Sequence, residues 1–266
     1  MSLDLTFFLM LAVRMAVAAG FVVSASVVAE RSGPAIGALV ATLPISAGPA
    51  YVFLALDHDA AFIAQGALAS LPINAATIVL GLTYVVLAQR HAALVSCAGA
   101  VAIWIILASI IRSVDWTLAG GLLVNVIAYA ICIPLLRRFQ RVKMPLITRR
   151  WYDIPLRAAL VAMLVATVVT LSGWVGPTIS GILALFPVVF TSMMLILHPR
   201  SGGKPTAAVI ANSAWGLLGL GVAIAMLHVA ALRFGSAIGL SLALSICVGW
   251  NLALWWNGRR KLVAAR

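Results

Sequence analysis

GPAIGALVATLP, at residues 33–44, returns as GPTISGILALFP at residues 176–187, an offset of 143 residues without a gap. The opening Gly-Pro, one isoleucine, one alanine and the final proline coincide, and most other pairs are apolar in both copies. A proline in the first turn favours the start of a helix, whereas a proline ten residues further on interrupts one. The sequence therefore predicts two related helices, each broken near its middle.

A second match at the same offset supports an internal duplication. Arg14 aligns with Arg157, and each arginine stands inside an apolar run. Because arginine is rare in such runs, its recurrence in register with the two broken helices is informative. We therefore expect two repeats that each contain one broken helix.

The composition identifies the class of protein. The chain has 266 residues, of which 64% are hydrophobic and 9% charged, and its mean hydropathy is +1.15. So few charges could not solvate a globular domain of this length, which predicts an all-α polytopic membrane protein. The first apolar run is long enough to span a bilayer and lacks a basic segment before it, so no cleavable signal peptide is expected.

The apolar runs predict about nine transmembrane helices, with eight or ten left open. Residues 1–112 would form a first repeat of four spans, and residues 151–266 a second. Residues 113–150 would supply the fifth span, as a linker helix, and a basic cytoplasmic loop. The nine spans are expected near 6–28, 34–56, 60–89, 92–111, 116–136, 154–171, 177–197, 206–230 and 236–256.

The net charge of +12 is concentrated where it would orient the chain. Most of it lies in the central loop and the C-terminal tail, at Arg137, Arg138, Arg141, Lys143, Arg149, Arg150, Arg259, Arg260, Lys261 and Arg266. Such clusters mark the cytoplasmic face of an inner membrane rather than a nucleic-acid site. Nine spans then place the N-terminus outside and the C-terminus inside, so that the two repeats run in opposite directions.

The broken helices are the predicted substrate site. A break within lipid is tolerated only where protein buries it or water reaches it, and the freed backbone groups can bind a polar ligand. The alternative is that the prolines are packing kinks, which are common in membrane helices. The candidate substrate-binding residues at the breaks are Thr42, Pro44, Ser46, Gly48, Pro187, Thr191 and Ser192.

Further candidates are the two arginines and several amides. Arg14 and Arg157, without a nearby intramembrane carboxylate, favour an anionic or zwitterionic substrate, unless they only extend toward the membrane surface. Gln65 and Asn212 stand in similar local sequences and could bind the substrate. Asn74, Asn125 and Tyr129 could also hydrogen-bond a substrate, although side chains of these kinds more often bond a neighbouring helix.

Other chemistry has weaker support. All six acidic residues are expected near membrane surfaces, so a proton-relay carboxylate at the midplane is missing and the coupling ion, Na⁺ or H⁺, stays open. Asp57 or Asp59, with His58 beside them, is the best proton-coupling candidate; the alternative is that these three residues form a solvated loop. The three cysteines have no metal-type spacing, and no cofactor is expected. Ser172 has no evident base in the sequence, and no metalloprotease or serine-hydrolase motif occurs, so no enzyme is expected.

These observations predict a transporter that moves a small polar, anionic solute by alternating access around the broken helices. A lipid flippase or a channel could be built in the same way. An intramembrane enzyme and a subunit of a larger complex are more distant alternatives, and a homodimer is possible. The likeness to inverted-repeat secondary transporters concerns topology alone.

Overall fold

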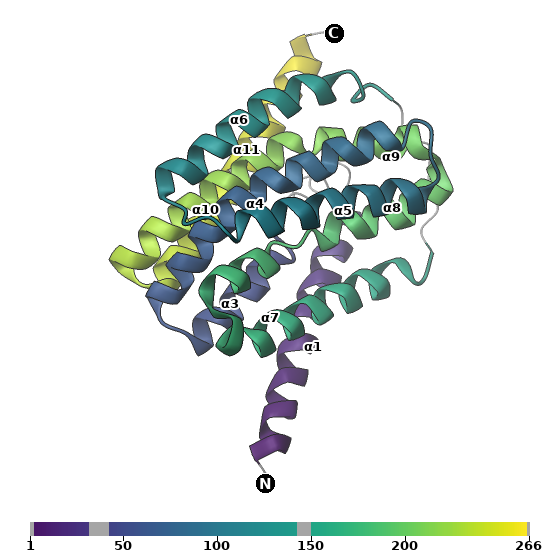
Figure 1. Ribbon diagram of the computed structural model, residues 1–266. Coiled ribbons are helices and arrows are strands. Elements are labelled where there is room, and N and C mark those ends of the chain that lie inside the picture. Colours follow the sequence, from purple (N-terminus) through teal and green to yellow (C-terminus); the bar gives the residue numbers. More distant parts are fainter. Residues whose placement is uncertain (1–2, 32–42, 143–149, 265–266) are drawn as a thin grey trace.

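A computed structural model describes residues 3–31, 43–142 and 150–264, and every regular element in these ranges is a helix. The helices, labelled as in Figure 1, are α1 Leu3–Arg31, α3 Ala47–Asp57, α4 Ala60–Leu87, α5 Ala93–Ile111, α6 Leu118–Arg137, α7 Asp153–Ala184, α8 Val188–Ser201, α9 Gly203–Asn212, α10 Ala214–Phe234 and α11 Ser236–Ala264. The described residues contain 7 helical stretches that are long and apolar enough to cross a membrane. The prediction of a polytopic helical membrane protein is confirmed at this level.

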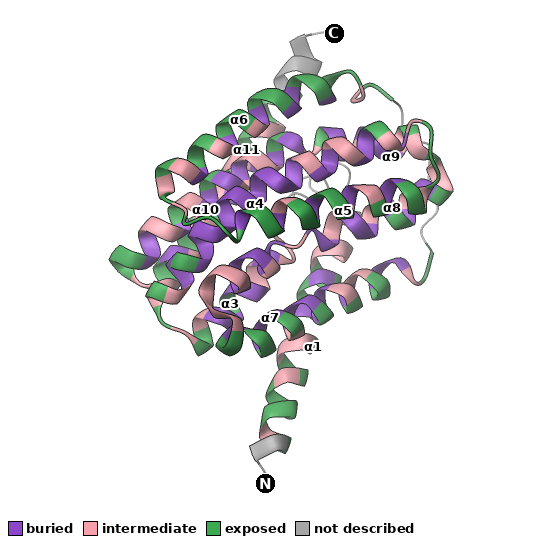
Figure 2. Cartoon of the chain, viewed as in Figure 1, coloured by how far each residue is buried: buried purple, intermediate pink, exposed green. Residues whose placement is uncertain are grey.

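Helix α4 forms the centre of the bundle. It packs against α5, α6, α7, α9 and α10, and Figure 2 shows it buried along much of its length, whereas α1 is largely exposed. Many of its buried residues are alanine or glycine, which lets neighbouring helices approach closely. Asp59 caps its first turn by accepting a hydrogen bond from the amide of Phe62 at 2.9 Å. The helix continues through Pro72 without ending.

The second broken helix has the predicted start and the predicted break. Gly176 has φ of 75°, a conformation that glycine adopts readily, and it separates the first segment of α7 from a short segment that begins at Pro177. The first segment thus extends beyond residue 171, where the sixth span was expected to end. The chain leaves the helix again at residues 185–187 and resumes as α8.

The first broken helix is described only from Leu43 onward. Residues 32–42, which include Thr42 and the first Gly-Pro, lie outside the described residues. Residues 43–46 are not helical, and α3 begins after them at Ala47. Both Pro44 and Pro187, the two prolines that the sequence pattern singled out, are therefore non-helical, and at Pro187 the structure describes helices on both sides of the break.

The two parts of the chain meet through close helix packing. Helix α1 packs against α7, and α4 packs against α10. The short segment that begins at Pro177 crosses α4 at Gly66, where a side chain added at Gly181 would clash with the Gly66 carbonyl group. Ser70 strengthens this crossing, because its hydroxyl donates to the Gly181 carbonyl at 2.7 Å.

Helices α3 and α8 end at opposite ends of α7. At the end of α3, Nε2 of His58 lies 2.8 Å from the hydroxyl of Ser172, late in the first segment of α7. At the end of α8, Arg200 binds Asp153, the first residue of α7, at 2.8 and 2.7 Å. Residues 153 and 172 are separated by about 28 Å of helix, close to the roughly 30 Å thickness of a bilayer core. Figure 1 shows α3 and α8 toward opposite ends of the bundle.

Candidate functional site

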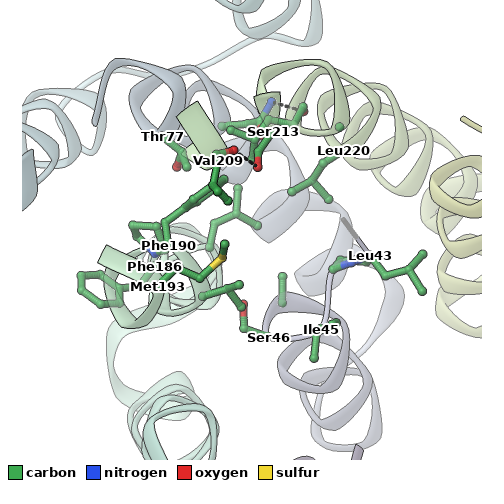
Figure 3. A pocket seen from close by; sticks show the side chains of 18 of the residues that line it. Leu43, Ile45, Ser46, Thr77, Phe186, Phe190, Met193, Val209, Ser213 and Leu220 are labelled. Carbon is green, nitrogen blue, oxygen red and sulfur yellow. Dashed lines mark hydrogen bonds between the residues drawn. The ribbon is translucent and has the colours of Figure 1, made fainter. Parts of the chain in front are cut away.

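A cavity of about 300 Å³, here called the central cavity, lies between the two interruptions. In Figure 3, Phe186, Phe190 and Met193 stand on one side of it and Leu43 and Leu220 on the other, with Ser46 and Ile45 below. Its wall is formed by Leu43, Pro44, Ile45, Ser46, Ala47, Asn74, Thr77, Leu185, Phe186, Pro187, Val189, Phe190, Met193, Val209, Asn212, Ser213, Gly216, Leu217 and Leu220. Segments more than a hundred residues apart in sequence thus enclose one space.

Both half-helices begin at this cavity. Ala47, the first residue of α3, and Val189, the second residue of α8, belong to its wall. The N-terminal end of a helix carries positive potential and amides without intrahelical partners. In α8, the amide of Val188 donates to Phe186 and that of Thr191 to Pro187, while those of Val189 and Phe190 have no partner in the described part of the chain. The cavity is therefore suited to an anionic group.

Apart from Ser46, which precedes α3, the polar side chains of the wall come from α4 and from the junction of α9 and α10. Thr77 donates to the Ile73 carbonyl at 3.0 Å and accepts from the indole of Trp104 at 3.2 Å. Ser213 donates to the carbonyl of Val209 at 3.1 Å. Each hydroxyl proton is thus used inside the protein, but the oxygens keep acceptor capacity.

Asn74 is the most deeply buried amide of the wall, with an exposed fraction of 0%. Its Nδ2 donates to Oδ1 of Asn125 at 3.0 Å, to the hydroxyl of Tyr129 at 3.0 Å and to the carbonyl of Leu217 at 3.2 Å. Its Oδ1 has no hydrogen-bond partner among the described residues. A buried acceptor without a partner is unusual and costly, so it marks Asn74 as a functional candidate.

Four of the predicted substrate-binding residues lie on the central cavity. They are Pro44, Ser46, Pro187 and Asn212. Asn212 is the most exposed of its polar neighbours, and its Nδ2 donates to Ala208 at 2.8 Å and to Gln140 at 3.3 Å. Gly48 lines an adjoining apolar cavity of about 410 Å³ between α1, α3, α10 and α11.

Three other predicted residues lie elsewhere. Thr191 and Ser192 are buried, but their hydroxyls donate to carbonyls of their own helix, at Pro187, Val188 and Val189, and neither residue belongs to the wall. Gln65 lines a third cavity of about 320 Å³, together with Arg112 and Asp115 at the connection between α5 and α6. Its predicted equivalence to Asn212 does not bring the two residues to one cavity.

The expectation that Arg14 lacks a nearby carboxylate is wrong. Both terminal nitrogens of Arg14 bind the carboxylate of Asp57, with 2.6 Å between Nη2 and Oδ1, and the guanidinium lies 5.9 Å from the ring centre of Phe53. Asp57 is therefore the paired last residue of α3 rather than part of a solvated loop. Arg157 lies one turn after Asp153 on α7, half-buried, and is not part of the central cavity.

Tyr152 lies beside the ion pair of Asp153 and Arg200. The Arg200 guanidinium lies 5.2 Å from the centre of the Tyr152 ring, and Arg150 donates to the Tyr152 hydroxyl at 2.9 Å. Hydrogen bonds from Arg150 and Arg200 lower the pKa of Tyr152 from its ordinary value. This end of the bundle is therefore a cationic cluster built around one carboxylate.

Ser172, which has no evident base in the sequence, lies beside His58. The Ser172 hydroxyl donates to the carbonyl of Val169 at 2.9 Å, so toward His58 it acts as an acceptor and Nε2 of His58 is the donor. In this arrangement the serine is not activated as a nucleophile. Within the described ranges, no group of three His, Cys, Asp or Glu side chains is placed to hold a metal ion.

The comparisons with known proteins add no relative. No protein-family model, curated protein or solved structure matches the chain. The geometry of the site is therefore the basis for inferring its function.

Proposed function

We propose that this protein is a membrane transporter that moves a small polar, anionic solute by alternating access. The observation that carries the proposal is the central cavity, which both interrupted helices line with the residues around Pro44 and Pro187. Broken helices near the middle of a membrane bundle, one from each half, are a recurring way to build a solute site in secondary transporters.

The proposed architecture consists of two inverted repeats, residues 1–112 and 151–266, joined by α6 and the basic loop in residues 113–150. Three features of the structure support this proposed architecture. Helices α1 and α7, which would be equivalent, pack together, as do α4 and α10. Helices α3 and α8 start at the same cavity and end at opposite ends of α7. The seven long apolar stretches, of which α7 contributes the segment before Gly176, and the two proposed broken helices would together give the nine spans expected from the sequence.

The anionic character of the solute rests on backbone groups rather than on arginines. Arg14 is engaged with Asp57, whereas the N-terminal ends of α3 and α8 converge on the cavity. Two helix N-termini and unpaired amides stabilise negative charge without a buried cation. On the positive-inside rule, we propose that the Arg200 end and the C-terminus face the cytoplasm and that the Asp57 end lies outside the inner membrane.

A second candidate is lipid translocation, which the adjoining apolar cavity favours. This cavity shares Leu43, Pro44, Ala47, Leu185 and Leu220 with the central cavity, and it is lined almost entirely by apolar residues. Val17 and Phe21 of α1, which also line it, are exposed on the surface of the bundle. An acyl chain could occupy this space while a headgroup occupies the central cavity.

The test begins with purified protein and a thermal-shift screen of small anions, zwitterions and cations, because a ligand of the folded state raises the melting temperature. Uptake of the stabilising solutes is then measured in proteoliposomes, beside a lipid-scrambling assay. Pro44→Ala and Pro187→Ala should each reduce uptake about tenfold or more while expression stays largely intact, since each change lets a helix close across the break.

Pro134→Ala provides the matched control. Pro134 also lies inside a membrane helix, α6, but not on the central cavity, so uptake should stay within about twofold of wild type. Wild-type uptake in both cavity variants would refute the idea that the breaks form the site. Scrambling without solute uptake would favour the lipid translocator instead.

A further inference from the structure

Resting on the proposed function, we infer that the solute is a small organic acid with a hydrogen-bond donor beside its carboxylate and an apolar side chain, and that Asn74 selects it by accepting from that donor. An α-amino acid and an α-hydroxy acid share this chemistry. The ammonium and the hydroxyl are the two possible sources of the donor.

The orientation of the Asn74 amide follows from its neighbours. Nδ2 of Asn125 donates to the carbonyls of Leu71 at 2.7 Å and Gly121 at 2.9 Å, and these carbonyls can only accept. Oδ1 of Asn125 must therefore face Asn74, which has to present its own Nδ2. The carbonyl of Leu217 makes the same demand on Asn74. Oδ1 of Asn74 is consequently left without a hydrogen-bond partner among the described residues.

This remaining acceptor belongs to a residue that lines the central cavity. Asn74 is fully buried, and its Oδ1 has no partner in the described part of the protein. A buried carbonyl oxygen is normally satisfied, and a ligand that donates to it would recover the free energy that burial costs. A solute without a hydrogen-bond donor would leave Oδ1 of Asn74 unpaired. The protein should therefore bind a solute that carries the donor more tightly than one that lacks it.

The acidic end of the solute is assigned to the half-helices. The amides of Val189 and Phe190 at the start of α8 and the start of α3 at Ala47 lie on the same cavity as Asn74. A carboxylate at these N-terminal ends is stabilised by the helix dipoles. Acceptor and donor groups of the protein are thus both present, which fits a solute with a carboxylate and a donor rather than an inorganic anion.

The apolar part of the cavity wall indicates the third feature of the solute, its apolar side chain. Phe186, Phe190, Met193, Leu217 and Leu220 offer apolar and aromatic surface. The volume of about 300 Å³ is at the lower end of the range for small-molecule sites. A compact acid with an apolar side chain matches both the size and the lining.

The test uses matched triples of acids that differ only at the carbon beside the carboxylate. The probes are alanine, lactate and propionate; leucine, 2-hydroxy-4-methylpentanoate and 4-methylpentanoate; and phenylalanine, 3-phenyllactate and 3-phenylpropionate. Affinities for the purified full-length protein are measured by isothermal titration calorimetry. In at least one triple, a donor-bearing acid should bind roughly tenfold to a hundredfold more tightly than its donor-free partner.

Two variants locate the preference. Asn74→Leu should reduce the affinity ratio within that triple to about one, because no acceptor remains for the donor. Tyr129→Phe is the matched control, since Tyr129 belongs to the same buried cluster but not to the cavity wall, and its hydroxyl, which can donate or accept, does not fix the orientation of the Asn74 amide. It should weaken both acids together and preserve the ratio. The wild-type comparison needs no variant, so the inference can be refuted even if Asn74→Leu does not fold.

The possible failures are distinguishable. Equal wild-type binding of all members of each binding triple would overturn the role of Asn74 while leaving an anion transporter in place. A preference that survives in Asn74→Leu would do the same. If none of the nine acids binds while another anion raises the melting temperature in the thermal-shift screen, this inference is refuted and the proposed transport of an anionic solute is not.

Discussion

In the two proposed repeats, the two ion pairs near opposite ends of the bundle occupy corresponding places but have opposite polarity. In the first half, Arg14 on α1 binds Asp57 at the end of α3; in the second, Asp153 on α7 binds Arg200 at the end of α8. Residues 57 and 200 differ by the same 143 positions that separate Pro44 from Pro187. Asp153 lies one helical turn before Arg157, the counterpart of Arg14.

The opposite polarity of the two ion pairs shows what the link between the two helices requires. Each half links its first helix to the outer end of its broken helix, and either charge can stand on either side of the link. The shared feature is the link itself rather than an arginine that attracts an anion. Arg14 therefore has a structural explanation, and the polar character of the site comes from the central cavity.

The two pairs are not equivalent in their surroundings. The C-terminal end of a helix disfavours an anion and favours a cation, so Asp57 depends on its partner whereas Arg200 is well placed even alone. Arg14 also lies inside a membrane-crossing stretch, Leu5–Val27, where the surface that it exposes would face lipid. We therefore expect the first ion pair to be the more sensitive to mutation, although its side chains are the more exposed, at 19% and 30% against 14% and 13%.

Charge reversal should have the largest effect. Asp57→Arg places two guanidinium groups together, and we expect transport to be lost and the melting temperature to fall by about 5–10 °C. Because the second half carries the opposite polarity at this place, Arg14→Asp combined with Asp57→Arg should recover much of both. The checks are differential scanning fluorimetry in detergent and uptake in proteoliposomes. A double variant as impaired as the single one would remove the argument that polarity is interchangeable.

Neutralisation should have a smaller effect that differs between the halves. Arg14→Gln leaves Asp57 unpaired at a helix C-terminus, and we expect a fall of about 5 °C in melting temperature. Asp153→Asn leaves Arg200 at a favourable helix end with Tyr152 beside it, and we expect a fall of about 2 °C. The same thermal measurement on both variants decides the order. A larger loss for Asp153→Asn would mean that burial outweighs the helix dipole and the membrane position.

The sequence predicts the broken helices because their causes are local. Proline removes a backbone donor wherever it stands, and Gly176 before Pro177 permits a backbone conformation that ends one segment and starts the next. The break at Pro187 and the start at Pro177 therefore agree with the structure, and residues 43–46 around Pro44 are not helical. The orientation of hydroxyls on the same helices does not follow from sequence. Thr191 and Ser192 bond to carbonyls of their own helix, which competes with any ligand.

The contacts between distant segments could not be read from the sequence. Arg14 and Asp57 are 43 residues apart, and His58 and Ser172 are 114 apart, so only the packed bundle brings them together. The sequence predicts that Asn74 either binds substrate or bonds a neighbouring helix. The structure gives its Nδ2 the second role, but the lack of a partner for Oδ1 depends on the orientation of Asn125, which no local pattern encodes.

The most direct test of the account is the sidedness of the two ends. Single cysteines at Trp174, beside the His58–Ser172 end, and at Lys204, beside the Arg200 end, are introduced after replacing Cys97, Cys132 and Cys247 with alanine. A membrane-impermeant maleimide should label Trp174→Cys in intact cells and Lys204→Cys only after permeabilisation. Labelling of both cysteines from the same side would contradict two inverted halves around one cavity.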